Sequence, residues 1–582
     1  MKIIYVGNNQ EARRKHLAKG GDVLLLLYDR WDDFGYKTRF PTVCRIGGEE
    51  IELGALRILF ADQQASHPFL TERREMGWDS TFPLEDVNFV SVPEELTFYE
   101  HLLDLLPEGG AREVATMLRD ASYLAHVRQD EDALSLIQTP GFRTSLQRER
   151  SSQNSFADGW RLLSGTAFDA TDLSFTFREP AGALSCLKMN FAAESLLPHD
   201  INVIIGPNGV GKSSLLRQMV KSWIQPQPGH AALNGAGFEP RPNLSQLVAV
   251  SYSPFERMPV DTDDEPSLVK PLKDKDIYRF FGFRGRQLSQ KTGRATSIRH
   301  SLGVPRANAA RSLIQCLTDD LRYSTIKAWA NKLQTLQRVL GSAIDFDVAA
   351  VKLQADAPVD LIVPDDPFEE VALLQVVELN DLGEEQITNY VPIAPGTTTI
   401  TVPVLLQHVD LDGGVTFFHD GKPLRLSSGQ RLFFYIVVNI LGVIRRNSLV
   451  IVDEPELFLH PTLEVQFVSM LKQILRTYSS KALLATHSAV TVREVPSRCV
   501  HVFEATDDGL AIKTPPFETF GGDVQRIASY VFGDRSVSKP HEAWLRDLLD
   551  THGTADEVIE ALGTELNEEI IIQLHAMENG KW

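Results

Sequence analysis

The chain has 582 residues, of which 43% are hydrophobic and 23% charged, and its formal net charge is −19. This length corresponds to roughly two to four domains, and the composition is typical of a soluble globular protein. No apolar run reaches the roughly 18 residues that a membrane-spanning helix needs, which argues against a membrane protein. The negative charge argues against a protein whose whole surface binds nucleic acid.

The cysteines and the first residues of the chain predict a cytoplasmic location. The four cysteines are widely separated and none lies in a C-x-x-C pair, so neither a zinc site nor a disulfide framework is expected. The segment that starts at Met1 lacks the long apolar core and the small-residue cleavage site of a signal peptide.

Residues 1–165 are expected to form an accessory domain. Apolar runs at 23–27, 51–53 and 56–60 predict short strands, and the pattern becomes helical around 94–135. No catalytic constellation occurs in this region, so a role in partner contact is expected. Strand patterns in 166–205, such as Leu173 to Phe177, predict an antiparallel edge for the domain that follows.

A phosphate-binding loop is predicted between an apolar β-branched run at 201–205 and a helical pattern. It comprises Gly206, Pro207, Asn208, Gly209, Val210, Gly211, Lys212 and Ser213, and Ser214 follows it. The glycines let backbone N–H groups surround a phosphate, and the positive end of the following helix points at the anion. Lys212 is expected to bridge the β- and γ-phosphates of ATP, and the Ser213 hydroxyl is expected to bind Mg²⁺.

A localised basic stretch lies between Ile277 and Thr318, where no Asp or Glu occurs. It carries eight cations: Arg279, Arg284, Arg286, Lys291, Arg294, Arg299, Arg306 and Arg311. In so acidic a chain, the Arg279–Arg311 region is a candidate contact for DNA, RNA or an acidic partner. The alternative is a solvated helical face that is balanced by acids folded nearby, such as those at 261–265.

Residues 257–411 are expected to be an insertion, helical in its first half and rich in strands in its second. Apolar residues recur at helical spacing from Ala307 to Leu340, but no sustained heptads follow, so a long coiled coil is not expected. At the other end of the chain, residues 516–582 are acidic and mostly helical, with an amphipathic pattern from Asp556 to Met577.

A second anion-binding motif is predicted where Leu426 is followed by Ser427, Ser428, Gly429 and Gln430 and then by a long apolar run. Ser427 would cap the helix that this run forms, and the N–H groups of the first turn would face outward. The alternative is an ordinary serine cap. Since Lys212 already serves the chain's own ATP, a second phosphate-binding helix end makes sense if it contacts ATP held by another subunit.

Two further strands end in candidate catalytic residues. The apolar strand at 448–452 ends in Asp453 and Glu454, which are costly at that position unless they serve a function. Asp453 is expected to hold Mg²⁺ through water, and Glu454 to orient and deprotonate the attacking water. A strand at 481–486 then leads to His487, which is a candidate contact for the γ-phosphate. The alternatives are an ordinary strand boundary and a structural histidine.

These four elements, in this order, resemble the ABC-type ATPases over residues 166–256 and 412–515, and the resemblance continues to 535. The run Asp453-Glu454-Pro455-Glu456-Leu457-Phe458-Leu459-His460-Pro461 resembles the DEPE-x-x-LHP form found in soluble ABC ATPases of the overcoming-lysogenisation-defect type. Related ATPase subunits occur in the Septu and retron anti-phage systems.

The resemblance implies a role for each motif residue. Lys212 and Ser213 would bind phosphate and Mg²⁺, Asp453 would bind Mg²⁺, and Glu454 would be the base. His487 would contact the γ-phosphate, Ser427 and Gly429 would act in trans, and His460 would lie in a loop that touches the dimer partner. Two residues depart from the pattern. Ser428 stands where transporters usually have Gly, and the segment 250–256 has no glutamine in the place of the glutamine loop, which leaves Glu256 or a serine for that role.

The predicted fold class is therefore α/β, with a P-loop ABC-type ATPase core, an N-terminal accessory domain, a mixed insertion and a helical C-terminal extension. The expected function is Mg²⁺-dependent ATP hydrolysis by a homodimer that sandwiches ATP, or by a higher oligomer built from it. It would act as the sensor or motor of a bacterial defence or nucleic-acid-processing complex, with a separate effector such as a nuclease.

Three alternatives remain open at this point. They are a transporter's nucleotide-binding subunit, a scaffold that binds ATP without turnover, and a nuclease in its own right. The large insertion speaks against the first and Glu454 against the second. The third would need a further domain, and the roughly 65 residues that follow residue 516 are too few for it.

Overall fold

The computed structural model describes most of the chain, and its contacts divide it into two compact units, Met1–Gly521 and Gly522–Trp582. The described residues are 1–32, 35–85, 87–165, 172–191, 196–224, 235–239, 242, 244–260, 277–288, 295–322, 331–363, 373–379, 385–507, 509–533 and 540–580. No helix among them is both long and apolar enough to cross a membrane.

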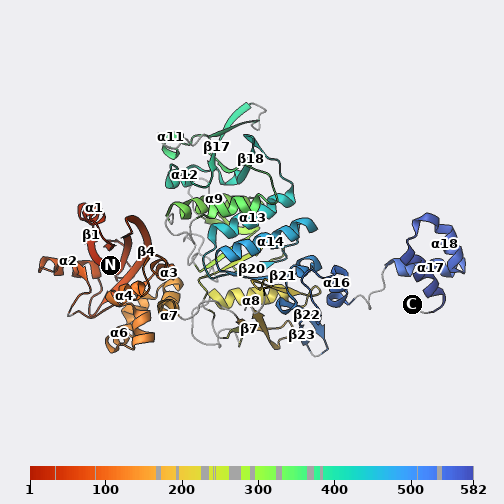
Figure 1. Cartoon of the computed structure of the whole chain (residues 1–582), viewed down its shortest axis with the longest axis horizontal. Helices are drawn as coiled ribbons and strands as arrows, with labels where there is room; N and C mark the ends of the chain where they lie inside the picture. Colours follow the sequence, from red (N-terminus) through yellow and green to blue (C-terminus); the bar gives the residue numbers. More distant parts are fainter. Residues whose placement is uncertain are drawn as a thin grey trace. The chain divides into compact units, whose positions relative to one another are not determined.

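The N-terminal region of the first unit, residues 1–165, is built on a six-stranded mixed sheet (Figure 1). In spatial order the strands are β5 (Thr81–Phe82), β1 (Lys2–Gly7), β2 (Val23–Leu27), β3 (Arg39–Ile46), β4 (Glu49–Phe60) and β6 (Phe89–Pro93). The connecting and following helices are α1 (Gln10–Ala18), α2 (Ser66–Glu75), α3 (Thr97–Leu105), α4 (Gly110–Met117), α5 (Ala121–Tyr123), α6 (Glu131–Ile137) and α7 (Arg150–Ser164). The alternating apolar residues of these strands bury a separate core against α3, α4 and α7.

The centre of the first unit is a seven-stranded sheet in which six neighbouring strands run parallel. In spatial order the strands are β12 (Tyr278–Gly282), β11 (Gln246–Ser251), β20 (Ser448–Asp453), β21 (Lys481–Thr486), β9 (Ile201–Ile205), β22 (Val500–Thr506) and β23 (Gly509–Lys513). Their near-continuous Val, Ile, Leu and Ala runs are typical of strands that are buried on both faces.

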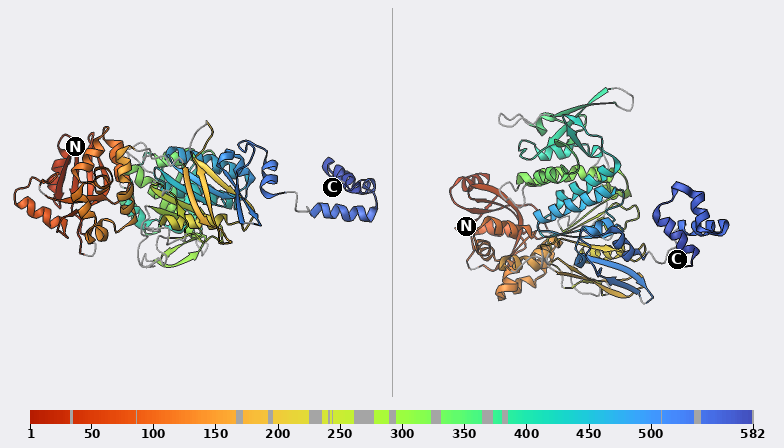
Figure 2. Two further views of the ribbon diagram at one scale, coloured as in Figure 1. Left: turned by 90° about the horizontal axis from the view of Figure 1, so that it is seen from below. Right: turned by 45° about the vertical axis from the view of Figure 1, so that its right-hand side comes forward.

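Helices cover both faces of this sheet (Figures 1 and 2). Helix α8 (Lys212–Ile224) covers one face, and α13 (Ser428–Val443) and α14 (Pro461–Thr477) cover the other. Because α8 follows β9 directly, its first residues lie at the carboxyl edge of the sheet, where open α/β sheets bind their ligands.

Two predictions about strands are corrected here. β7 (Asp172–Arg178) and β8 (Leu184–Asn190) are antiparallel, as expected, but with β10 (Gly237–Phe238) they form a separate three-stranded sheet rather than an edge of the main one. Their apolar side chains, among them Phe175 and Phe177, pack with α8 in the core. β12, in turn, falls within the expected insertion 257–411 but pairs with β11, so the chain leaves the core only after it.

The inserted segment carries helices and a second sheet. β13 (Arg284–Leu288) and β14 (Ala295–His300) form a hairpin, and α9 (Gly303–Arg322) and α10 (Lys332–Leu340) pack on α13. Beyond α9 lies an antiparallel sheet (Figure 1) of β16 (Leu374–Leu379), β17 (Glu385–Ile393), β15 (Val348–Lys352), β18 (Val415–His419) and β19 (Lys422–Pro423), with α11 (Val359–Ile362) and α12 (Val402–His408).

The second unit is helical. It contains α16 (Val524–Phe532), α17 (Pro540–His552), α18 (Ala555–Leu562) and α19 (Glu568–Glu578), and Leu545, Val558 and Leu574 form its core. The amphipathic pattern expected from Asp556 to Met577 is therefore divided between two helices, with a break between α18 and α19.

Candidate nucleotide-binding site

Three neighbouring strands of the main sheet bring the sequence-predicted residues to one edge. β21 lies between β9 and β20, and all three run parallel. The phosphate loop follows β9, His487 follows β21, and the acidic pair ends β20. Because carboxyl ends of parallel strands meet at the same edge, this strand order places the histidine between the loop and the acids.

The glycines of the loop are required by its backbone. A Cβ atom on Gly206 would come within 2.3 Å of the carbonyl oxygen of Phe503, and Gly209 and Gly211 have φ angles of +83° and +102°. Side chains at these positions would clash or be strained. The loop can therefore approach a phosphate with its backbone N–H groups exposed toward it.

Lys212 lies near the end of the phosphate loop, and its side chain reaches back to the start of the loop. Its side chain is buried, and its Nζ donates to the carbonyl oxygens of Gly206 at 2.8 Å and Pro207 at 3.0 Å. Burial lowers the pKa of Lys212 to about 8, against the opposing effect of Asp453 and Glu454. The lysine is thus a preplaced cation that a triphosphate would stabilise in its charged form.

Ser213 and Asp453 form a direct pair. The Ser213 hydroxyl donates to Oδ1 of Asp453 at 3.1 Å, and Asp453 is only 3% exposed. Burial, followed by the charge of Glu454, raises the pKa of Asp453 to about 7. A cation bound beside this carboxylate would reverse that effect, and hydroxyl and carboxylate oxygens are ligands that Mg²⁺ prefers.

The rest of the Mg²⁺ shell would have to come from nucleotide and water. Among the described residues, no group of three or more His, Cys, Asp or Glu side chains is arranged to hold a metal by itself. In nucleotide enzymes, one or two protein ligands typically bind Mg²⁺, and the phosphates and water complete its shell. The residues present therefore fit a metal that arrives with ATP.

Glu454 and His487 face each other across the site. Oε1 of Glu454 lies 3.9 Å from Nε2 of His487, whose Nδ1 lies 3.4 Å from Nζ of Lys212. About a quarter of each of the two side chains is exposed, so both can reach water or a nucleotide. Burial and the neighbouring Lys212 lower the pKa of His487, which favours the neutral ring at neutral pH.

The backbone at Glu454 leaves the extended conformation of the strand that ends at Asp453. Its φ angle is +52°, in the left-handed region that non-glycine residues rarely adopt, and its N–H donates to the carbonyl oxygen of Ala485 at 2.8 Å. Such backbone strain is typical of functional positions. The sequence predicted the residue but carried no signal for this conformation.

The signature residues form the exposed N-terminus of α13. Ser427 accepts the N–H of Gln430 at 3.2 Å, and Gln430 Oε1 accepts the N–H of Ser427 at 3.0 Å, which makes a capping box. A Cβ on Gly429 would approach the carbonyl oxygen of Phe458 to 2.9 Å. Within the described part of the chain, no hydrogen bond or ion pair joins these residues, or Ser428, to the phosphate loop, Asp453 or His487.

The structure separates the two candidates for the glutamine-loop role. Ser251 lies opposite Asp453 in the parallel register of β11 and β20, and its Oγ is buried without a hydrogen-bond partner among the described residues. Glu256 is occupied elsewhere, because Met258 donates its N–H to Oε2 at 2.7 Å and Arg284 lies 3.6 Å from Oε1. Ser251 is therefore the residue of this segment that lies beside the pair formed by Ser213 and Asp453.

The basic stretch is partly neutralised within the fold. Arg284 is paired with Glu256, burial lowers the pKa of Arg311 while Asp412 opposes that shift, and Arg279 lies 5.6 Å over the ring of Phe281. Arg306 hydrogen-bonds Tyr435. Lys291 and Arg294 lie outside the described residues, as do the acids expected at 261–265, and Arg286 and Arg299 lie in β13 and β14.

Sequence reasoning missed two features, one at this site and one away from it. Glu456, in the same run as the acidic pair, accepts the backbone N–H of His487 at 2.6 Å. Glu456 is the second glutamate of the DEPE-x-x-LHP form, and the resemblance implied no role for it. The other feature is the contact between the N-terminal region and the end of α13, where Arg445 donates to Glu95 at 2.8 Å and Arg446 lies 3.4 Å from Asp104.

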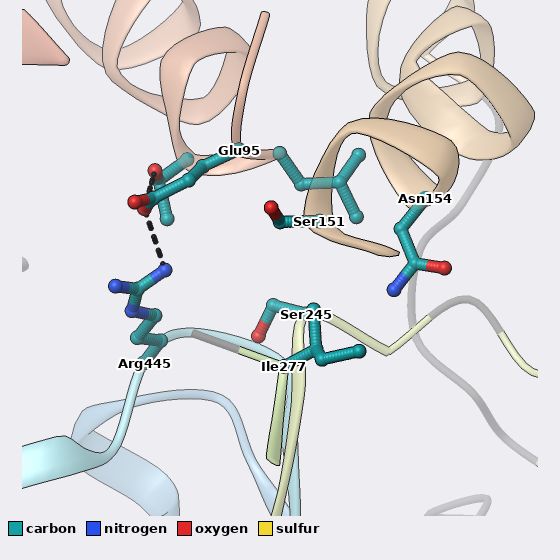
Figure 3. A pocket seen from close by; sticks show the side chains of 8 residues that line it. Glu95, Ser151, Asn154, Ser245, Ile277 and Arg445 are labelled. Carbon is teal, nitrogen blue, oxygen red and sulfur yellow. Dashed lines mark hydrogen bonds and ion pairs between the residues drawn. The ribbon is translucent and has the colours of Figure 1, made fainter. Parts of the chain in front are cut away.

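A small cavity lies beside this contact and away from the phosphate loop (Figure 3). In the figure Glu95 reaches toward Arg445, and the side chains of Ser151, Asn154 and Ser245 border the space between them. Six of its eight lining residues have polar side chains, and so small a space suits bridging water rather than a nucleotide. The residues on the N-terminal side, 95–97, 151 and 154, include no catalytic constellation.

The fold and the site define a P-loop ATPase domain of the α/β class. A family described as "AAA domain, putative AbiEii toxin, Type IV TA system" matches residues 276–493, which include Ser427, Asp453 and His487 but begin after the phosphate loop. Protein ea59 of Escherichia phage lambda is 25% identical over 522 residues, which cover 87% of this chain and 85% of that protein.

Part of this chain is also similar to a solved structure. The SMC head domain from Thermotoga maritima is 11% identical, with a TM-score of 0.23, and the match covers 59% of this chain and 98% of that chain.

Proposed function

We propose that the chain is an ABC-type ATPase that hydrolyses ATP with Mg²⁺. The observation that carries this proposal is the gathering of Lys212, the Ser213–Asp453 pair, Glu454 and His487 at one edge of the sheet. When bound, the metal would neutralise charge on the β- and γ-phosphates and orient them. Glu454 has the position of a general base, and the neutral ring of His487 can hydrogen-bond the γ-phosphate or the attacking water.

We also propose that two copies close on two ATP molecules. The exposed N-terminus of α13 at Ser427 supports this, because a helix N-terminus favours an anion and, among the described residues, no hydrogen bond or ion pair joins it to the phosphate site of its own chain. Each copy would supply a phosphate loop to one site and a helix end to the other, so the interface closes with two-fold symmetry.

The cellular role that we propose is a sensor or motor in the conflict between bacteria and phages, with a separate effector protein such as a nuclease. Two observations support it: the matched family's description names a putative toxin of a toxin–antitoxin system, and the similar protein ea59 belongs to a phage. The insertion and the N-terminal region speak against a transporter subunit, and the geometry of Glu454 speaks against a scaffold without turnover.

Phosphate release by the purified chain tests the enzymatic part of this proposal. We expect ATP hydrolysis that requires Mg²⁺ and is lost, with ATP binding, in Lys212→Ala, because the variant lacks the cation that bridges the phosphates. The matched control is Lys221→Ala, an exposed lysine of the same helix, which should hydrolyse ATP like the wild type. A wild type that releases no phosphate with Mg²⁺ and ATP would contradict the proposal.

A second prediction concerns a nucleic-acid surface on the basic stretch. Replacing Arg286, Lys291, Arg294 and Arg299 by Glu should weaken binding of DNA or RNA at least tenfold at low salt, and wild-type affinity should fall steeply as salt rises. Arg284 is kept, because it pairs with the buried Glu256. The charge-matched control replaces Arg13, Arg14, Lys15 and Lys19, in and just after α1.

Binding of duplex DNA, single-stranded DNA and RNA would be measured at several salt concentrations, with and without ATP. If the two four-fold variants and the wild type bind all three equally, or if none binds any, the nucleic-acid interpretation fails. An acidic protein partner would then be the better account of this stretch.

A further inference from the structure

Glu456 lies in the turn that follows the acidic pair and contacts the backbone of His487. Its Oε1 accepts the N–H of His487 at 2.6 Å, and the Thr486 hydroxyl hydrogen-bonds the same carboxylate. Neither contact reaches a group that would touch phosphate or the attacking water. The side chain therefore acts on the position of the histidine rather than on the reaction.

The buried position of the Glu456 carboxylate is energetically unfavourable. Its Oε2 is shielded from water and has no hydrogen-bond partner among the described residues, and burial raises the pKa of Glu456. An unsatisfied buried oxygen destabilises the folded protein, and more so when the group is charged. A smaller or apolar residue would avoid this cost, so the backbone hydrogen bond offers a reason for the glutamate.

A second carboxylate holds the residue after the histidine. The Ser488 hydroxyl donates to Oε2 of Glu464 at 2.5 Å and also accepts the N–H groups of Val490 and Thr491 at the start of α15 (Ala489–Arg493). Glu464 is only 8% exposed and lies in α14. Residues 486–488 are thus contacted by two carboxylates of the segment 454–464, which also carries Glu454.

We propose that Glu456 is a positioning residue that fixes His487 relative to Glu454 and Lys212. This rests on the proposed ATPase function. The distances it maintains are the 3.9 Å between His487 and Glu454 and the 3.4 Å between His487 and Lys212. Glu454 and Glu456 are two residues apart in one turn, which the N–H of Leu457 closes by donating to the carbonyl oxygen of Glu454 at 3.1 Å, so one short segment carries both the base and the residue that contacts the histidine backbone.

The kinetic test compares Glu456→Ala with Glu456→Gln. The alanine variant should lower kcat by about 10²-fold, because displacement of a catalytic group by about 1 Å costs that much. Its KM should change by less than about threefold, because ATP is bound by the phosphate loop. The glutamine variant should keep near wild-type turnover, because its amide oxygen accepts the same N–H.

Two controls separate positioning from stability. Asp120→Ala removes another buried carboxylate that accepts a backbone N–H, that of Tyr123 at 2.8 Å, in the N-terminal region. It should lower thermal stability and leave turnover per folded molecule unchanged. In a His487→Ala background, Glu456→Ala should lower turnover no further, because the residue acts only through the histidine.

Hydrogen exchange gives a readout that does not need activity. In the protein without nucleotide, Glu456→Ala should speed exchange of the His487 amide at least tenfold, and Glu456→Gln should preserve its protection. Unchanged exchange in the alanine variant, or additive losses in the double variant, would overturn the inference. A wild type without turnover would contradict the ATPase proposal alone, because the exchange result would still decide whether Glu456 holds this segment.

Discussion

Glu454→Gln is expected to lower ATP turnover by about 10²- to 10⁴-fold, the range that a positioned general base contributes. The amide fills the same volume beside His487 but cannot take a proton from water. ATP should still bind, because Lys212, Ser213 and Asp453 are untouched. Phosphate release and equilibrium binding of ATP, measured on the same preparation, separate the two effects.

Trapped ATP should also favour the closed dimer. With Mg²⁺ and ATP the Glu454→Gln chain should shift from about one chain mass to two in light scattering, whereas the wild type should return to one as ATP is consumed. Glu504→Gln is the isosteric control, because Glu504 is exposed and pairs with Lys513 in the neighbouring strand. Wild-type turnover in Glu454→Gln would show that another group is the base.

A mixture of Lys212→Ala and Ser427→Arg chains is expected to recover activity that each variant lacks alone. The first chain lacks the lysine that grips its own ATP, and the second carries a bulky cation at the helix end that should close on its partner's ATP. In a mixed dimer, the Ser427→Arg chain's phosphate loop faces the intact Ser427 of the Lys212→Ala chain. One of the two sites is then complete.

The size of this recovery follows from the counting of sites. If chains pair at random and each site works alone, half of the dimers are mixed and half of their sites are intact, which gives about a quarter of wild-type activity. The control replaces the second chain by one that carries both substitutions, since no complete site can then form. Differently tagged chains that copurify without recovering activity would contradict the ATP sandwich.

In Ser427→Arg, the effect of losing the helix cap must be distinguished from the effect of losing the contact with the partner's ATP. Removing Ser427 breaks the capping box with Gln430, which costs about 1 kcal/mol. Thermal unfolding of Ser427→Arg should therefore show a small decrease in stability. A large decrease would mean that the variant tests the fold of α13, and Ser427→Ala would then replace it in the mixing experiment.

The local motifs of this site could be predicted because their physical requirements are local. The phosphate loop needs glycines where Gly209 and Gly211 have positive φ angles, and the cap of α13 needs Ser427 and Gln430 three residues apart. These requirements involve residues that lie close together in the sequence, so short motifs reveal them. The apolar run before Asp453 likewise specifies a strand that is buried on both faces.

Only the tertiary structure decided how these pieces meet. The place of β21 between β9 and β20 sets His487 beside Lys212, and the register of β11 and β20 sets Ser251 beside Asp453. The hold of Glu456 on the His487 amide spans 31 residues of sequence. Strand order and register depend on pairing between distant segments and on which faces are buried together, and no short stretch of sequence carries that information.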